Sequence, residues 1–134
     1  MKLIVCLDDR MGMTFNHRRQ SRDRLLIDDL EKLVGDRKIY MMPYSEGLFL
    51  KNNVRYILTD TPFTDADRED YCFIETVDPT SYMQSVTEIV IYHWNRHYPA
   101  DLYFTFDMKG FTLTQTAEFA GSSHEKITRE VWKR

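Results

Sequence analysis

The opening of the chain holds the feature that most constrains its fold. Residues 2–7 read KLIVCL, a continuous apolar run that ends abruptly at Asp8 and Asp9. A strand that is buried on one face alternates polar and apolar residues, whereas a strand buried on both faces is apolar throughout. The run therefore predicts the central strand of a sheet that is covered on both sides.

The next part of the chain alternates helical and extended patterns. Apolar residues recur at spacings of three and four over Leu26–Val34, which predicts an amphipathic helix with Ser21 as its N-terminal cap and Gly35 as its stop. Short β-rich runs predict strands over 38–42, 54–58 and 71–74, and helical turns are expected over 44–51 and after Asp78. The acidic segment 59–70 is predicted to be a solvated surface loop.

From residue 88 onward the pattern is mostly extended. Four β-rich segments follow one another with short connections, over 88–94, 102–106, 111–116 and 126–132. A chain that alternates strands with helices and then adds strands favours an α/β fold. We predict a three-layer sheet, parallel at its centre, with antiparallel strands added at the C-terminal edge.

Length and composition limit the class of protein. The 134 residues correspond to about one domain at the usual ~100–200 residues, so we expect a single α/β domain over 1–134. With 21 acidic against 18 basic residues, a nucleic-acid binder that uses its whole surface is excluded, and any basic site must be local. Cys6 and Cys72 lie in apolar runs and are expected to be buried free thiols. The opening apolar run is too short for a signal peptide or a membrane span, which predicts a cytoplasmic protein without membrane partners.

Both ends of the chain resemble a known family. LIVCLDDRMGM resembles the first strand and following loop of dihydrofolate reductases, and IYHWNRHYPADLYF, FTLTQTAEF and ITREVWKR resemble that family's closing strands and hairpin. The resemblance covers about half of the chain and implies a dihydrofolate-reductase-like fold. In that family a nicotinamide cofactor rests on a paired-glycine turn, and a helix carries a carboxylate that serves the pterin.

The sequence departs from both of these family features. It contains no Gly-Gly pair, which the close approach of backbone to phosphate requires. Asp23 stands roughly where the family has its carboxylate, but neighbouring arginines are expected to keep it ionised, a poor state for donating a proton. We therefore expect the fold without the reductase activity, and no resident cofactor.

The stretch MGMTFNHRRQSRDR carries a second resemblance, to small bacterial proteins labelled ribonuclease Z. That label implies a metallo-hydrolase with a dense His-x-His-x-Asp-His motif, because clustered ligands are needed to hold zinc and activate water. The four histidines of this chain are scattered, and no such motif is present. No metal site is predicted.

The most unusual stretch is Asn16–Arg24, which holds four arginines in a chain that is acidic overall. Guanidinium groups bind phosphates and carboxylates in a bidentate manner, and ligands of open α/β sheets bind outside the strand ends. The alternative is that these arginines pair with nearby aspartates. The predicted anion or ligand site consists of Asn16, His17, Arg18, Arg19, Arg22 and Asp23.

Two further stretches carry polar or aromatic groups. In YHWNRHYPAD, planar side chains beside arginine suggest stacking on a nucleobase, and packing in the core is the alternative; the residues concerned are Trp94, Arg96 and His97. GSSHEK, residues 121–126, contains the ingredients of a nucleophile and base, and we interpret it as a polar hairpin loop.

Three functions remain open at this point. The leading hypothesis is a binding protein that holds a phosphorylated small molecule or nucleotide through the arginine-rich loop. RNA binding or processing is the first alternative, and a protein-interaction module without a small-molecule site is the second. Neither a reaction nor an oligomeric state follows from the sequence.

Overall fold

A computed structural model describes residues 1–134 and contains one large and one small sheet. The large sheet has seven strands, in the order β5 (Arg55–Leu58), β4 (Lys38–Met41), β6 (Tyr71–Phe73), β1 (Lys2–Leu7), β7 (Glu88–His93), β10 (Ile127–Lys133) and β9 (Thr112–Phe119). Neighbours from β5 to β7 pair in parallel, and β10 pairs antiparallel with both β7 and β9. The predicted α/β sheet, parallel at its centre with antiparallel C-terminal strands, is therefore confirmed.

The central position of β1 is also confirmed. Lys2 of β1 lies opposite Tyr71 of β6 on one side and Glu88 of β7 on the other. Leu3, Val5 and Leu7 point into one apolar cluster, while Ile4 joins the cluster on the opposite face. Both faces of the strand are covered, as its unbroken apolar sequence requires.

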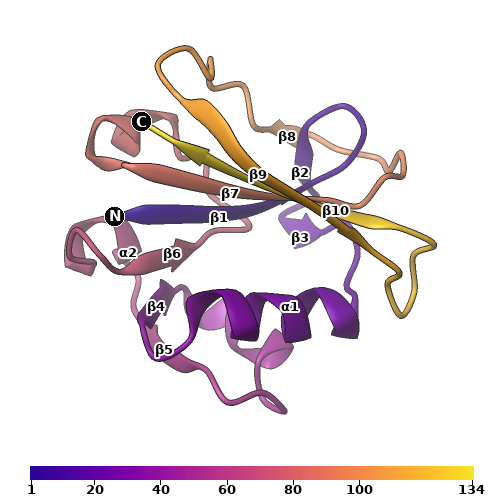
Figure 1. The fold of residues 1–134 in the computed structure, drawn as a ribbon, viewed down its shortest axis with the longest axis horizontal. Coiled ribbons are helices and arrows are strands. Elements are labelled where there is room, and N and C mark those ends of the chain that lie inside the picture. Colours follow the sequence, from indigo (N-terminus) through magenta and orange to yellow (C-terminus); the bar gives the residue numbers. More distant parts are fainter.

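The two faces of the sheet are covered by different kinds of structure. The helix α1 (Arg24–Val34) lies along one face, as Figure 1 shows. The other face is covered by the small sheet of β3 (Arg18–Arg19), β2 (Gly12–Phe15) and β8 (Leu102–Tyr103), together with short helical turns. The turns on this face are α2 (Pro62–Asp65) and η2 (Thr80–Ser85). A third turn, η1 (Pro43–Leu48), packs against the cluster on the face that carries α1.

The helix α1 forms where its apolar periodicity predicts. Leu26, Ile27, Leu30 and Val34 are buried against the sheet, and Gly35 follows with a φ of +56°, a conformation that glycine adopts without strain. The expected cap at Ser21 is wrong. Asp23 is the N-cap, and its carboxylate accepts hydrogen bonds from the backbone N–H groups of the first turn.

Three other expectations need correction. The stretch after β1 is not a plain loop, because it forms the β2–β3 hairpin. The strand expected over 102–106 is limited to β8, which pairs with β2 in the small sheet and not with the C-terminal strands. The acidic segment 59–70 contains the single turn α2, whose Pro62 is buried.

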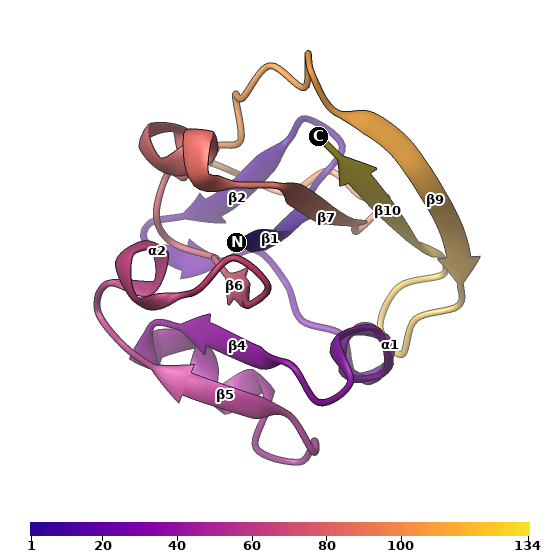
Figure 2. The ribbon, with the colours of Figure 1, turned by 60° about the vertical axis from the view of Figure 1, so that its left-hand side comes forward.

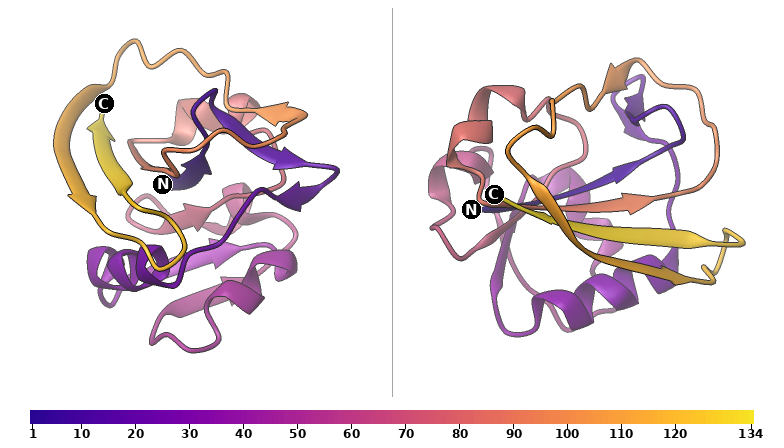
Figure 3. Two further views of the ribbon diagram at one scale, coloured as in Figure 1. Left: turned by 90° about the vertical axis from the view of Figure 1, so that its right-hand side faces the viewer. Right: turned by 45° about the horizontal axis from the view of Figure 1, so that its top comes forward.

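The far edge of the large sheet is formed by β9, which is eight residues long and mostly exposed (Figure 3). No helix of the structure has the length and apolar character needed to cross a bilayer.

Candidate functional site

The arginine-rich stretch begins in the β2–β3 hairpin. Asn16 and His17 form its two-residue turn, with φ values of +50° and +62°, which matches the twist that two-residue hairpin turns need. Their side chains and that of Arg18 are exposed to solvent. The hairpin therefore presents Arg18 outward, with no carboxylate near enough to form an ion pair.

Arg19 points the other way and is neutralised within the protein. Its Nε lies 2.8 Å from Oε2 of Glu75, and its Nη2 lies 2.9 Å from Oε1 of the same carboxylate. Ser45 donates a further hydrogen bond of 2.7 Å to Glu75, and the guanidinium lies 4.4 Å from the ring centre of Tyr44. The bond to Glu75 raises the pKa of Arg19, so this arginine serves the fold.

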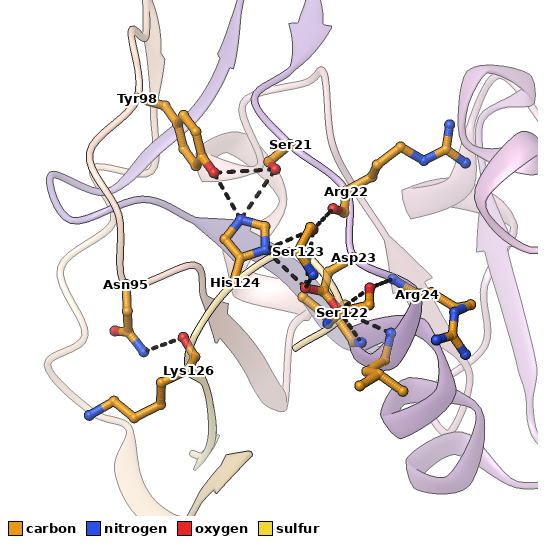
Figure 4. A network of polar contacts seen from close by, with 12 residues as sticks. Ser21, Arg22, Asp23, Arg24, Asn95, Tyr98, Ser122, Ser123, His124 and Lys126 are labelled. Atoms are coloured by element: carbon orange, nitrogen blue, oxygen red, sulfur yellow. Dashed lines mark hydrogen bonds and ion pairs between the residues drawn. The ribbon is translucent and has the colours of Figure 1, made fainter. Parts of the chain in front are cut away.

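Asp23 is buried in a hydrogen-bond network that joins the start of α1 to the loop between β9 and β10 (Figure 4). Oδ1 accepts from the N–H groups of Leu25, Leu26 and Ser122, and Oδ2 accepts from the N–H of Ser123 and from Nδ1 of His124 at 2.9 Å. The carboxylate has no position left for a ligand.

These hydrogen bonds fix the charge of Asp23. Burial alone would raise the pKa of this carboxyl group, but the backbone donors of Ser122 and Ser123 and the bond from His124 outweigh burial and hold the pKa far below its ordinary value. The expectation that Asp23 is ionised agrees with this direction, although backbone donors and His124, and not neighbouring arginines, are responsible.

His124 continues the network on its other nitrogen. Nε2 lies 2.8 Å from the hydroxyl of Tyr98 and 3.2 Å from Oγ of Ser21. The imidazole side chain is 1% exposed, and Trp94 stacks on it with 4.7 Å between ring centres. An ionised carboxylate can only accept, so Nδ1 carries a proton, and Nε2 lies within hydrogen-bond distance of the two hydroxyl groups.

Two surface hollows lie beside this network. The hairpin hollow has a volume of about 610 Å³ and is lined by Phe15, Asn16, Arg18, Arg19, Gln20, Tyr98 and Pro99. The α1–η1 hollow has a volume of about 450 Å³ and is lined by Arg22, Asp23, Arg24, Ile27, Asp28, Gly47, Leu48, Leu50, Lys51 and Asn52.

The predicted anion-binding set is thus divided between two places. Asn16, Arg18 and Arg19 line the hairpin hollow, whereas Arg22 and Asp23 line the α1–η1 hollow. His17 projects from the hairpin turn and lines neither hollow.

The second predicted set is not brought together either. Trp94 is 5% exposed and belongs to the core, where its ring contacts His124 and not the solvent. The strand β7 ends at His93, and Asn95 has a φ of +56°, so Arg96 and His97 lie on an exposed loop and do not continue the strand.

Several residues of the two hollows were not singled out from the sequence. Arg24 and Lys51 come together from the start of α1 and the residues after η1, and Leu48 and Leu50 form an apolar wall beside them. Among these, only Arg24 carried a local signal, because it belongs to the arginine-rich stretch. No group of three or more His, Cys, Asp or Glu side chains is arranged to hold a metal ion.

Comparison with solved structures relates the fold to one family. A dihydrofolate reductase from Enterococcus faecalis, described as complexed with NADP(H) and RAB-propyl, superimposes with a TM-score of 0.71 over 99% of this chain and 95% of its own, at 9% sequence identity. No protein-family model and no curated protein matches the sequence. The chain therefore has a dihydrofolate-reductase-like fold.

Proposed function

We propose that this chain is a binding protein that holds a phosphorylated small molecule or a nucleotide in the α1–η1 hollow. The observation that carries the proposal is that three cationic side chains in this hollow have no carboxylate partner. Arg22, Arg24 and Lys51 line this hollow, and none of them forms an ion pair with a carboxylate.

Each carboxylate nearby already has a hydrogen-bond or ion-pair partner within the protein. Asp23 is saturated by the donors described above, and Asp28 accepts a hydrogen bond of 2.9 Å from Asn52. Asp29 does not line this hollow and forms an ion pair of 2.7 Å with Arg129 of β10. The three cations of the lining outnumber its two carboxylates, Asp23 and Asp28, and none of the three is held in an ion pair. Guanidinium groups match phosphate oxygens in a bidentate geometry.

The hollow also has an apolar wall. Ile27, Leu48 and Leu50 line it, and Leu50 is 68% exposed, the largest exposed fraction among the large apolar side chains. Small-molecule sites combine an apolar lining with a few polar groups that fix orientation. A ligand with a phosphate and a carbon-rich part, such as a nucleoside, fits this combination better than inorganic phosphate does.

A second part of the proposal is that the chain lacks reductase activity. The carboxyl end of β6, next to β1, leads to Glu75, which holds Arg19 and Ser45 close to the sheet. These side chains are already paired with one another, so the end of this strand offers no free donor to the phosphates of a dinucleotide. The absence of a Gly-Gly pair in the sequence supports the same conclusion.

Binding is tested by thermal unfolding and isothermal titration calorimetry with ADP and with inorganic phosphate. We expect ADP to raise the Tm of the unaltered chain, by an amount equivalent to about 2.7 kcal/mol at 100 times the Kd. The double variant R22A/R24A should keep the Tm of the free protein and lose the ADP-dependent rise. R68A is the matched control, because Arg68 is exposed and lines neither hollow.

Two results would oppose the proposal. The first is an absence of ADP binding up to millimolar concentration, and the second is equal binding by the double variant. The variant R18A distinguishes the two hollows, because loss of ADP binding in R18A would place the site in the hairpin hollow. For the reductase part, we expect no oxidation of NADPH above background with dihydrofolate, and a steady turnover would refute it.

A further inference from the structure

Three side chains from two segments of the chain form an ordered hydrogen-bonded series beside the α1–η1 hollow. Ser21 lies between β3 and α1, Asp23 caps α1, and His124 lies in the loop between β9 and β10 (Figure 4). Oγ of Ser21 is 3.2 Å from Nε2 of His124, and Nδ1 of His124 is 2.9 Å from Oδ2 of Asp23. A hydroxyl, an imidazole and a carboxylate thus stand in the order that activates a nucleophile.

The environment of His124 suits a general base. Its Nδ1 proton is held by the ionised Asp23, so in the neutral ring the lone pair of Nε2 faces the hydroxyl of Ser21. Stacking on Trp94 and burial of the imidazole keep the ring in this orientation. Such a ring needs no rearrangement to take a proton.

The nucleophile is better placed for substrate than its partners. Ser21 is half-buried, while the side chains of Asp23 and His124 are almost completely buried. Its sequence neighbours Gln20 and Arg22 line the hairpin hollow and the α1–η1 hollow, respectively. The backbone N–H groups of Ser21 and Arg22 donate to no protein acceptor and are therefore unoccupied.

We propose that Ser21 is a catalytic nucleophile, activated by His124 and oriented through Asp23, that hydrolyses small carboxylic esters. Oγ of Ser21 attacks the ester carbonyl carbon while its proton passes to Nε2 of His124. The C–O bond to the alcohol then breaks, and the alcohol leaves with that proton. Water attacks the acyl-serine with the same base, which releases the carboxylic acid and restores Ser21, so the sum is ester plus water to acid plus alcohol.

Tyr98 modulates this arrangement. Its hydroxyl lies 2.8 Å from Nε2 and 3.3 Å from Oγ of Ser21, so in the resting protein it competes with Ser21 for the lone pair of His124. Removing that hydroxyl leaves Ser21 as the sole side-chain partner of Nε2. A purely structural network would lose a hydrogen bond in Y98F and gain no reactivity.

The test combines covalent labelling with hydrolysis. A fluorophosphonate probe, followed by peptide mass spectrometry, should modify the full chain at Ser21, and p-nitrophenyl acetate should be hydrolysed with turnover. S21A should lose labelling and at least about 100-fold in hydrolysis rate. S81A is the matched control, because Ser81 is exposed and makes no side-chain hydrogen bond, and it should behave as the unaltered chain.

The variant Y98F should label faster than the unaltered chain. If S21A does not fold, as judged by circular dichroism, the position of the label on the unaltered chain and the rate of Y98F decide the matter. An unlabelled chain, a label on another residue, or slower labelling of Y98F would overturn the proposal. Because R22A/R24A leaves Ser21 in place, failure of the phosphate site and failure of this activity are separate results.

Discussion

Replacing Asp23 by asparagine tests how the fold holds the start of α1 in place. Asparagine is as good a helix cap as aspartate, so an exposed cap would tolerate the change with little loss. Here, however, both carboxylate oxygens accept from buried donors. In D23N one oxygen becomes an NH₂ group, which cannot accept from the N–H of Ser123 or from Nδ1 of His124.

The size of the loss follows from those two bonds. Leaving the N–H of Ser123 without an acceptor costs about 1–3 kcal/mol, and losing a charge-assisted bond to His124 costs about 1.5–3 kcal/mol. We therefore expect D23N to lower the free energy of unfolding by about 2.5–6 kcal/mol at pH 7. Urea denaturation followed by circular dichroism measures it, with D36N as control, since Asp36 is exposed and its carboxylate has no partner.

The pH dependence gives an independent check on the same reasoning. The folded pKa of Asp23 is depressed, so its contribution to stability is fully present above the unfolded value of about 3.9 and is lost as the pH falls toward the folded value. The difference in the free energy of unfolding between D23N and the unaltered chain should therefore become smaller below about pH 4. A difference in unfolding free energy under 1 kcal/mol at pH 7, or a difference that stays constant down to pH 2.5, would show that Asp23 acts only as an ordinary helix cap.

Three further predictions concern other parts of the fold. G121A should destabilise the chain by several kcal/mol in thermal unfolding, because a Cβ at Gly121 would collide with the capping carboxylate; an unchanged Tm would mean that the loop shifts freely. R19A should lower the Tm of the ligand-free protein, because it leaves the carboxylate of Glu75 without its charge partner, and unaltered stability would return Arg19 to the ligand-binding set. The buried thiol of Cys72 should not react with Ellman's reagent at pH 8 until denaturant is added, since burial raises its pKa to about 12, and rapid reaction of Cys72 in the native state would contradict that burial.

Features of the fold that depend on local patterns could be predicted from the sequence. The continuous run in β1 and the spacing of Leu26, Leu30 and Val34 record burial directly, so the central strand and α1 followed from them. The β2–β3 hairpin was missed because its strands have only four and two residues, too few to show alternation. Its one local signal was Asn16, a residue that tolerates positive φ at a tight turn.

The candidate site depended on contacts that the sequence does not display. Asp23 and His124 are 101 positions apart, and nothing near either residue indicates that they share a buried hydrogen bond. The arginines of one short stretch were expected to act together, but the hairpin directs Arg19 to Glu75 and leaves Arg22 to another hollow. Side-chain direction in an irregular segment is decided by tertiary packing, which composition and spacing do not encode.

The place of β1 in the sheet sets a constraint on synthesis in the cell. The strand β1 is synthesised well before its two partner strands, which begin only at Tyr71 and Glu88. At about 5–20 residues per second, an apolar segment waits several seconds in the nascent chain before either partner has been made. The sheet around β1 therefore cannot form until β7 has been made, and LIVCL stays an unpaired apolar segment to which a chaperone could bind during that interval.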